Sequence, residues 1–120
     1  MKAATQIAPP DAGPTLIEAA ARLESLGNPT RLSIYRLLVK SGPVGLPVGE
    51  IQRRLGVPAS TLSHHLANLV QNDLVTQLRE GRVLRCKPNF EQMSELLTFL
   101  TDECCLDMGG DCGPDSCGET

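Results

Sequence analysis

Four of the five cysteines in this 120-residue chain lie in its last seventeen residues: Cys104, Cys105, Cys112 and Cys117. Aspartates and glycines surround them, so the segment is too polar to form a hydrophobic core, and packing does not explain the cysteines. Thiolates prefer soft ions such as trivalent arsenic or antimony, cadmium, mercury and zinc. An ion bound to several of them would order the segment around itself. We therefore interpret residues 104–120 as a thiol-based sensing tail.

The rest of the sequence favours a reducing compartment for these thiols. The N-terminal residues lack the basic stretch and long apolar run of a signal peptide, and no apolar run approaches membrane-spanning length. We therefore expect a cytoplasmic protein that does not enter a membrane. In that setting an odd number of cysteines indicates reactive or ligating thiols. Disulfides in a secreted protein and a redox-labile tail without function are the alternatives.

The formal net charge of −3 hides an asymmetry along the chain. Residues 28–88 contain nine basic and three acidic side chains, a net charge of +6, whereas the two flanks together carry −9. A cationic middle suits the phosphate backbone of a nucleic acid, from which anionic ends would be kept away. A merely solvated basic surface would give the same pattern, so the charge alone does not decide.

Capping residues and apolar periodicity predict five helices, and two runs of strand-forming residues predict a β-hairpin with Gly81 in its turn. The expected helices occupy residues 15–27, 28–41, 48–55, about 58–70 and 89–100, and the expected strands occupy 74–78 and 83–87. We divide the chain into a flexible segment at 1–14, a packed domain at 15–103 and the tail at 104–120. A packed region of roughly 90 residues is small enough to favour a partner subunit.

Four of these helices carry an apolar stripe with helical spacing, and the short third helix ends at a Gly56 cap. The stripes are Leu16, Ala19, Ala20, Leu23 and Leu26 in the first helix; Leu32, Tyr35, Leu38 and Val39 in the second; Leu62, Leu66, Leu69 and Val70 in the fourth; and Phe90, Met93, Leu96, Leu97 and Leu100 in the last. The tight turn at 56–58 between two short helices predicts a helix-turn-helix.

The expected elements follow the order of a winged helix-turn-helix, a mainly α fold with a β-hairpin wing. This order is helix, helix, short helix, recognition-type helix, hairpin and helix. Over about residues 15–101 the chain resembles the arsenic-responsive ArsR/SmtB repressors. The resemblance is carried by LGNPTRLSIYRLL at 26–38, PASTLSHHLANLVQNDLV at 58–75 and LREGRVLRC at 78–86. It implies a homodimer joined through its first and last helices, with two recognition helices presented to a two-fold operator of double-stranded DNA.

The fourth helix carries hydroxyls, imidazoles and an amide that could read base edges in the major groove. These side chains are Ser60, Thr61, Ser63, His64, His65 and Asn68. A metal site at the two histidines is the weaker alternative, because neighbours on a helix diverge by about 100°. No carboxylate or thiol lies at a spacing that would complete such a site.

Arginines on the hairpin form the second candidate contact with DNA. Arg79, Arg82 and Arg85 could reach phosphates or the minor groove, with Arg82 at the tip. The alternative is a solvated edge strand whose charges prevent aggregation. The three aromatic residues, Tyr35, Phe90 and Phe99, fall on or near core stripes, so a stacking platform for RNA is not expected.

The resemblance also frames the sensing site. Trivalent arsenic takes three thiolates, of which Cys104 and Cys105 are expected to supply two. The resemblance implies Cys112 as the third ligand, although Cys117 could also reach. The Cys-x-Cys of many arsenic repressors is absent from the start of the third helix, as are the His and Asp ligands of zinc sensors from the last helix. This pattern favours thiophilic ions over zinc or nickel.

Cys86 lies on the second hairpin strand, where a half-buried packing residue is the first interpretation and an additional ligand is the second. A methylated arsenical has two exchangeable positions, so Cys104 and Cys105, with or without Cys86, would suffice for it. We therefore expect As(III) as the effector, with Sb(III), methylarsenite and Cd(II) or Hg(II) as alternatives. No organic cofactor is expected.

Ion capture by the tail is expected to oppose operator binding through a change in dimer geometry. A thiol enzyme is not expected, because Cys104 and Cys105 follow the end of a helix beside Asp102 and Glu103, which raise a thiol pKa. A repressor switched by thiol oxidation stays open. A tail folded by structural zinc is less favoured, since Cys-Cys-x6-Cys-x4-Cys is not an ordinary zinc spacing.

Overall fold

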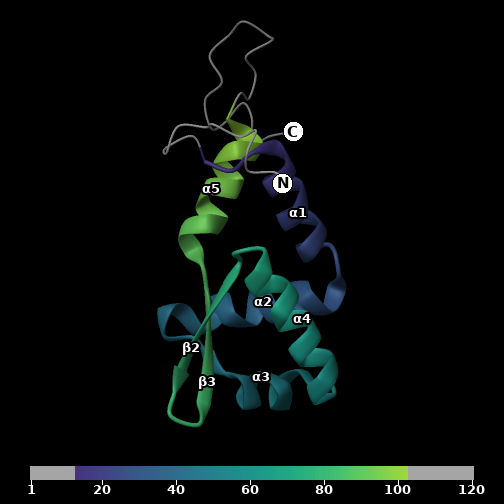
Figure 1. Ribbon diagram of the computed structural model, residues 1–120, viewed down its shortest axis with the longest axis vertical. Helices are drawn as coiled ribbons and strands as arrows, with labels where there is room; N and C mark the ends of the chain where they lie inside the picture. Colours follow the sequence, from purple (N-terminus) through teal and green to yellow (C-terminus); the bar gives the residue numbers. More distant parts are fainter. Residues whose placement is uncertain (1–12, 103–120) are drawn as a thin grey trace, which may run out of the picture.

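A computed structural model describes residues 13–102, so residues 1–12 of the expected flexible segment and the whole sensing tail at 104–120 lie outside the described residues. Cys104, Cys105, Cys112 and Cys117 are therefore not placed. The described residues form five helices, a short 3₁₀ helix and three strands (Figure 1). In chain order these are α1 Leu16–Leu26, α2 Pro29–Ser41, the 3₁₀ helix η2 Gly42–Val44, β1 Leu46–Pro47, α3 Val48–Leu55, α4 Ala59–Gln71, β2 Val75–Glu80, β3 Val83–Pro88 and α5 Phe90–Thr101.

Local sequence signals set the helix boundaries. Thr15 forms the predicted capping box, because its hydroxyl accepts from the Glu18 backbone N–H and the Glu18 carboxylate accepts from the Thr15 N–H, each at 3.1 Å. Asn28 caps α2 by accepting from the N–H groups at positions 30 and 31, with Pro29 at the first helical position. Gly56 ends α3 in the left-handed region at φ 69°. The predicted helices are confirmed, and the fold is a winged helix-turn-helix.

The wing is a three-stranded antiparallel sheet in the order β1-β3-β2. The hairpin β2–β3 matches the prediction, turns at Gly81 with φ 65° and reaches Glu80, beyond the expected end of the strand. Strand β1 was not predicted, because residues 42–47, which link α2 to α3, are rich in glycine and proline, a composition typical of loops. In the structure Leu46 pairs with Cys86 on β3.

Gly45 makes this third strand possible. It has φ +76° and ψ −166°, a conformation that is nearly confined to glycine. A Cβ atom at this position would overlap the backbone carbonyl oxygen of Cys86. The link therefore approaches β3 so closely that only a residue without a side chain fits.

The hydrophobic core lies among α2, α3, α4 and the sheet. Its buried residues are Ile34, Tyr35, Leu38, Ile51, Leu62, Leu66, Leu69, Leu74, Val75 and Cys86. The predicted stripe of α4 is confirmed, since Val70 also packs against this cluster. On α2 the prediction is partly wrong: Ile34 is buried, whereas Leu32 and Val39 are more than a third exposed. The buried face of α2 is rotated toward Ile34 because the helix packs against β3 and α4 as well as α1.

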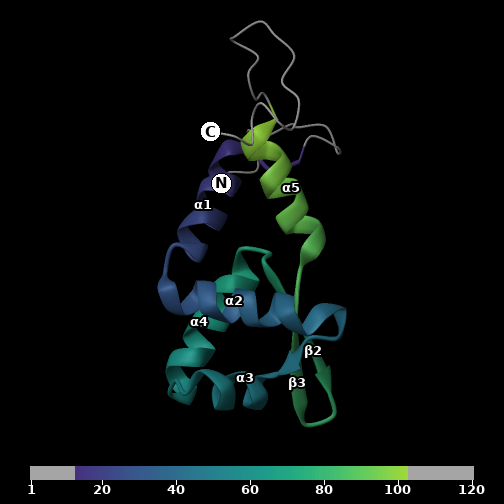
Figure 2. The same cartoon turned by 180° about the vertical axis from the view of Figure 1, so that it is seen from behind.

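Helices α1 and α5 rise from this core at one end of the molecule (Figures 1 and 2). Their apolar stripes are only partly used within the chain. On α1 the buried residues are Ala19, Arg22 and Ser25, and on α5 only Leu96 is fully buried. The exposed large apolar side chains of this end are Leu16, Ile17, Leu23, Phe90, Leu97 and Leu100. Within residues 13–102 no helix has the length and apolar character needed to cross a membrane.

Candidate nucleic-acid interface

Helices α3 and α4 form the helix-turn-helix, and α4 has two distinct faces. Leu62, Leu66 and Leu69 are buried, which anchors the helix on the core. Ser60, Ser63 and His64 are exposed, and Thr61, His65 and Asn68 are half-buried. All six predicted contact residues therefore have some access to solvent, and the three exposed ones are free of hydrogen bonds to other side chains in the described part of the chain.

His65 is held by a residue of another helix. The guanidinium Nη1 of Arg31 on α2 lies 3.2 Å from His65 Nδ1. The same guanidinium donates through Nε to the backbone carbonyl of Ser25 near the end of α1, at 2.7 Å. Burial lowers the pKa of the His65 imidazole, and the nearby charges of Arg31 and His64 lower it further. His65 is therefore favoured in its neutral form.

Asn68 is engaged inside the protein. Its side-chain Oδ1 accepts a short hydrogen bond from the hydroxyl of Ser25, which is buried on α1. Asn72 also contacts this oxygen, at 3.4 Å. One face of the Asn68 amide is thus committed to holding α4 against α1, so we give it a positioning role in addition to the predicted contact with DNA.

The end of α4 is fixed by Arg22 of α1. This buried arginine donates through Nε to the Asn72 carbonyl at 3.2 Å and lies 3.5 Å from the carboxylate of Asp73. Asp73 has φ 62°, the left-handed conformation that turns the chain from the helix into β2. A cation at this helix terminus also complements the helix dipole. Arg22, Ser25 and Arg31 together connect the α1 end of the molecule to the recognition helix.

The wing arginines differ in their availability. Arg79 and Arg82 are exposed and make no ion pair in the described residues. Arg85 is only a quarter exposed, and its Nε donates to the Glu80 carboxylate at 3.0 Å. Arg79 and Arg82 are therefore free to meet a phosphate, whereas Arg85 would first have to leave Glu80.

A cationic patch on α3 was missed by sequence analysis. Arg53 and Arg54 both contact the Glu50 carboxylate, three and four positions earlier on the helix. Hydrogen bonds from Arg54 and Arg53 lower the pKa of Glu50. The spacing was visible in the sequence as a helical ion-pair pattern. Because two arginines share one carboxylate, this turn of α3 keeps a net positive charge.

Cys86 is completely buried in the core rather than half-buried as expected. Gln77 on β2 is 3.5 Å from its sulfur, and burial raises the pKa of the thiol. A neutral thiol among apolar side chains is a poor ligand, so the packing interpretation is the better one. No group of three His, Cys, Asp or Glu side chains in residues 13–102 is arranged to hold a metal ion.

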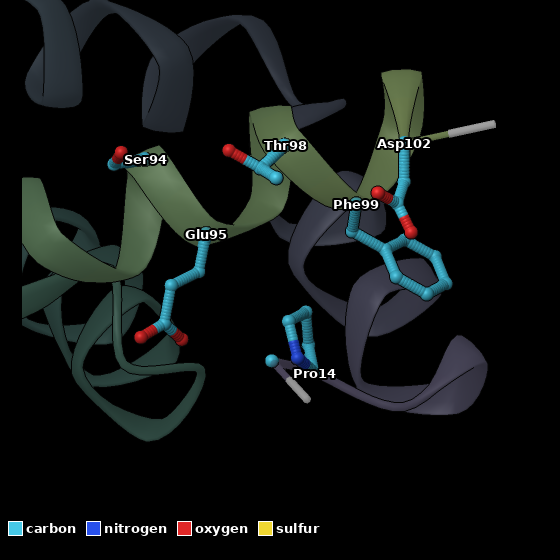
Figure 3. A pocket seen from close by; sticks show the side chains of 7 residues that line it. Pro14, Ser94, Glu95, Thr98, Phe99 and Asp102 are labelled. Carbon is cyan, nitrogen blue, oxygen red and sulfur yellow. The ribbon is translucent and has the colours of Figure 1, made fainter. Parts of the chain in front are cut away.

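A pocket of about 570 Å³ lies at the other end of the molecule, between the residues that precede α1 and one face of α5. Figure 3 shows Pro14 opposite α5, with Glu95 on one side of it and Phe99 on the other. Gly13, Ser94, Thr98 and Asp102 complete the lining, which combines polar and apolar groups. This pocket is remote from the candidate nucleic-acid interface.

Comparison with known proteins identifies the domain. Residues 26–77 match the family model of a helix-turn-helix domain. The chain is similar to the HTH-type transcriptional regulator YgaV of Escherichia coli strain K12, with 31% identity over 88 residues that cover 73% of this chain and 87% of YgaV.

Solved structures narrow the family. The chain shares the fold of the ArsR family transcriptional regulator RHA00566, with a TM-score of 0.68, 18% identity, and coverage of 82% of this chain and 99% of that one. It is 27% identical to the homodimeric winged helix-turn-helix domain of Mb0332 from Mycobacterium bovis, a possible ArsR-family regulator (TM-score 0.60; 74% and 82% covered). A possible transcriptional regulator for arsenical resistance is 26% identical (TM-score 0.60; 68% and 82% covered). The chain belongs to the HTH-type transcriptional regulators, and it shares the fold of solved ArsR-family regulators.

In this regulator the matched residues 26–77 include α2, α3, α4 and the start of β2. Helix-turn-helix proteins place the second helix of the motif in the major groove, with the first helix crossing the backbone. By position, α3 corresponds to the first helix of such a motif and α4 to the second. In Figure 2, α3, which carries the cationic turn, runs between α4 and the β2–β3 hairpin that carries Arg79 and Arg82.

Proposed function

We propose that this regulator is a homodimeric repressor of the ArsR family that leaves its operator when As(III) binds the thiolates of Cys104, Cys105 and Cys112. The observation that carries the proposal is the cysteine cluster, which begins three positions after the end of α5 at Thr101. Sb(III), methylarsenite and Cd(II) are the alternative effectors.

DNA binding rests on the three elements that present polar and cationic groups together. Helix α4 supplies Ser60, Ser63, His64 and His65 for the major groove, and the wing supplies free Arg79 and Arg82. The cationic turn of α3 adds phosphate contacts. Cationic contacts release counterions from DNA, so binding should weaken steeply as salt concentration rises.

Homodimerisation is supported by the exposed apolar side chains of α1 and α5. Leu16 is 73% exposed and Leu97 is 56% exposed, which is unusual for leucines placed at regular helical spacing. A second copy of the chain would cover them and give the two-fold symmetry that an operator with two half-sites requires. The homodimeric state of the Mb0332 domain agrees with this assignment.

The chemistry of capture is ligand exchange without oxidation or reduction. Arsenous acid, As(OH)₃, exchanges its three hydroxyls for three thiolates, and the three thiol protons leave with the hydroxyls as water. Cys104 and Cys105 are neighbours and Cys112 follows after a glycine-containing stretch, so one tail has enough reach for all three bonds. Cys86 is left out because it is buried in the core. The similar structure described as a possible transcriptional regulator for arsenical resistance supports the choice of metalloid.

Ion and operator are expected to oppose each other by linkage. If the ion-bound tail favours a dimer geometry that misplaces the two α4 helices, each ligand weakens the binding of the other by the same factor. A coupling of about 3 kcal/mol would lower operator affinity roughly a hundredfold. Such a change is enough to release a repressor from its site.

The test is a titration of the reduced full-length protein bound to a fluorescent duplex that it has itself selected from a randomised library. Arsenite, trivalent methylarsenite, Cd(II) and Zn(II) are added separately, and anisotropy reports release. We expect arsenite to release DNA at near-stoichiometric amounts. Cys104→Ser with Cys105→Ser should abolish the response while leaving DNA affinity unchanged.

Two matched variants sharpen this experiment. Cys112→Ser should lose the response to arsenite and keep the response to methylarsenite, because only the former needs a third thiolate. Cys117→Ser, in the same tail, should behave as the wild type. Release by arsenite from the double serine variant would contradict the proposed site. Release that depends on an oxidant and is reversed by a non-thiol reductant would favour the thiol-oxidation switch instead.

A further inference from the structure

We propose that Arg31 is a positioning residue for DNA recognition: it fixes the tautomer of His65 so that α4 presents the imidazole Nε2–H as a hydrogen-bond donor to the operator. This inference rests on the proposed DNA-binding role of α4. It assigns a specific function to a residue of α2, outside the recognition helix.

The geometry ties one guanidinium to two other helices. Arg31 Nε donates to the Ser25 carbonyl of α1 at 2.7 Å, which fixes the plane of the guanidinium. Its Nη1 then lies 3.2 Å from His65 Nδ1. A guanidinium that is anchored at Nε has little freedom at Nη1, so Arg31 on α2 orients the imidazole of His65 on α4.

The chemistry of the pair decides where the imidazole proton sits. A guanidinium has five N–H donors and no acceptor, and it stays protonated in proteins. A hydrogen bond at 3.2 Å therefore requires Nδ1 to be the acceptor. In the neutral imidazole the proton must then be on Nε2. Arg31 thus selects one of two tautomers that are otherwise close in energy.

The opposite edge of the His65 ring is available for an external partner. Nε2 makes no hydrogen bond within residues 13–102. In this part of the chain the buried side-chain polar atoms that lack a partner are Arg22 Nη1 and Tyr35 Oη, so Nε2 of His65 is not a buried atom. Nε2 of this half-buried residue therefore reaches solvent. An N–H donor in the major groove can meet O6 or N7 of guanine, N7 of adenine or O4 of thymine.

The charge state of His65 agrees with this role. Burial, Arg31 on α2 and His64 on α4 all lower its pKa. The neutral donor is therefore maintained at neutral pH, and the contact reads an acceptor without adding a charge. His64 provides an internal reference, since its exposed ring makes no hydrogen bond within the described residues.

The first test observes the tautomer directly in the full-length protein without DNA. Nitrogen-15 NMR of labelled imidazoles separates a protonated ring nitrogen from an unprotonated one. We expect His65 to show an unprotonated Nδ1 and a protonated Nε2, and His64 to show an average of both tautomers. Arg31→Met should move His65 toward the His64 pattern. A protonated His65 Nδ1 in the wild type would overturn the inference without any DNA experiment.

The second test measures the ratio of affinities for the selected duplex and a scrambled duplex. Arg31→Met should lower this ratio roughly tenfold, in the range expected for one lost base contact. Arg36→Met is the matched control, because it removes an equal charge from an exposed position of the same helix and should leave the ratio unchanged. A wild-type protein that binds neither duplex would contradict the proposed function while leaving the tautomer result intact.

A double-variant cycle separates positioning from general stability. If Arg31 acts through His65, then Arg31→Met should have little further effect on the ratio in a His65→Ala background. His65→Gln, whose amide can place a donor near the Nε2 position, should keep more of the ratio than His65→Asn. An undiminished effect of Arg31→Met in the His65→Ala protein would overturn the positioning role.

Discussion

The end of the molecule that carries α3, α4 and the wing can be set against the end that carries α1 and α5 (Figure 1). At the first end, apolar residues of α4 are buried and its polar side chains are exposed. At the second end, Leu16, Leu97 and other large apolar residues are exposed. One chain is therefore sufficient to build the end that we propose to face DNA. The apolar side chains of the other end would be covered only by the second copy that we propose.

The largest effect is expected where the wing is joined to the core. Gly42 and Gly45 share nearly the same backbone conformation, with φ 78° and 76° and ψ −165° and −166°. Alanine at either position would cost about 1–3 kcal/mol in backbone strain. At Gly45 the new Cβ would also overlap the Cys86 carbonyl, whereas at Gly42 it would meet nothing within 4 Å. We expect Gly45→Ala to lose more than about 4 kcal/mol of unfolding free energy, because backbone cannot move aside cheaply.

Urea unfolding of the two alanine variants measures this difference, with Gly42→Ala as the control for backbone strain. Equal losses in the two proteins would show that the contact between the link and β3 does not matter. In that case β1 would not be needed to hold the wing against the core.

The next effect compares a leucine from each end. Leu38 is fully buried in α2, and Leu38→Ala should cost about 2–5 kcal/mol at any protein concentration. Leu97 is exposed, and Leu97→Ala should change the unfolding of a single chain by less than about 0.5 kcal/mol. In a dimer that buries Leu97, however, the variant should weaken association and make the unfolding midpoint more dependent on protein concentration.

Sedimentation velocity together with unfolding at two protein concentrations checks this prediction. Association of Leu97→Ala with wild-type affinity would remove α5 from the dimer interface. A core-sized loss for Leu97→Ala at high dilution would mean that this leucine packs within its own chain.

Sequence reasoning succeeded where a local signal determined the structure. The Thr15 capping box, the Asn28-Pro29 helix start and the Gly56 cap are each specified by neighbouring residues, so the helix boundaries were predictable. Strand β1 was not, because two residues pair with β3 only after the chain has folded around Gly45. Periodicity placed Leu32 and Val39 inside, although the packing of α2 against several elements buries Ile34 instead.

In the candidate site, too, local patterns were predictable from the sequence and long-range contacts were not. Residue types on α4 identified the polar face, which depends only on helical periodicity. The contacts of Arg31 with His65 and of Ser25 with Asn68 join residues 34 and 43 positions apart, and no spacing rule indicates them. The position of Cys86 on the second hairpin strand was predicted, but its complete burial depends on β1 and the core around it.

A smaller effect is expected from the hydrogen bond that joins the two ends. Ser25→Ala removes the donor to Asn68 and leaves that amide oxygen with the longer contact from Asn72. We expect a loss of about 1 kcal/mol of unfolding free energy, the usual worth of one partly buried hydrogen bond. Ser33→Ala, at an exposed position of α2, is the control and should be neutral or slightly stabilising. Equal behaviour of the two variants would mean that the hydrogen bond between Ser25 and Asn68 contributes nothing to stability.

The smallest effect is the pH dependence that Arg31 imposes on stability through His65. Because the folded-state pKa of His65 lies below the ordinary value near 6.5, the unfolded chain binds more protons in the interval between the two. This contribution to stability is complete above about pH 6.5, falls as the pH drops through the interval and levels off below the folded-state pKa. Urea midpoints at about pH 7.5 and about pH 5.5 should therefore differ more in the wild type than in Arg31→Met, which retains only the effects of burial and His64. His64→Asn should keep most of the wild-type difference, and an unchanged difference in Arg31→Met would place the cause of the lowered pKa outside the contact between α2 and α4.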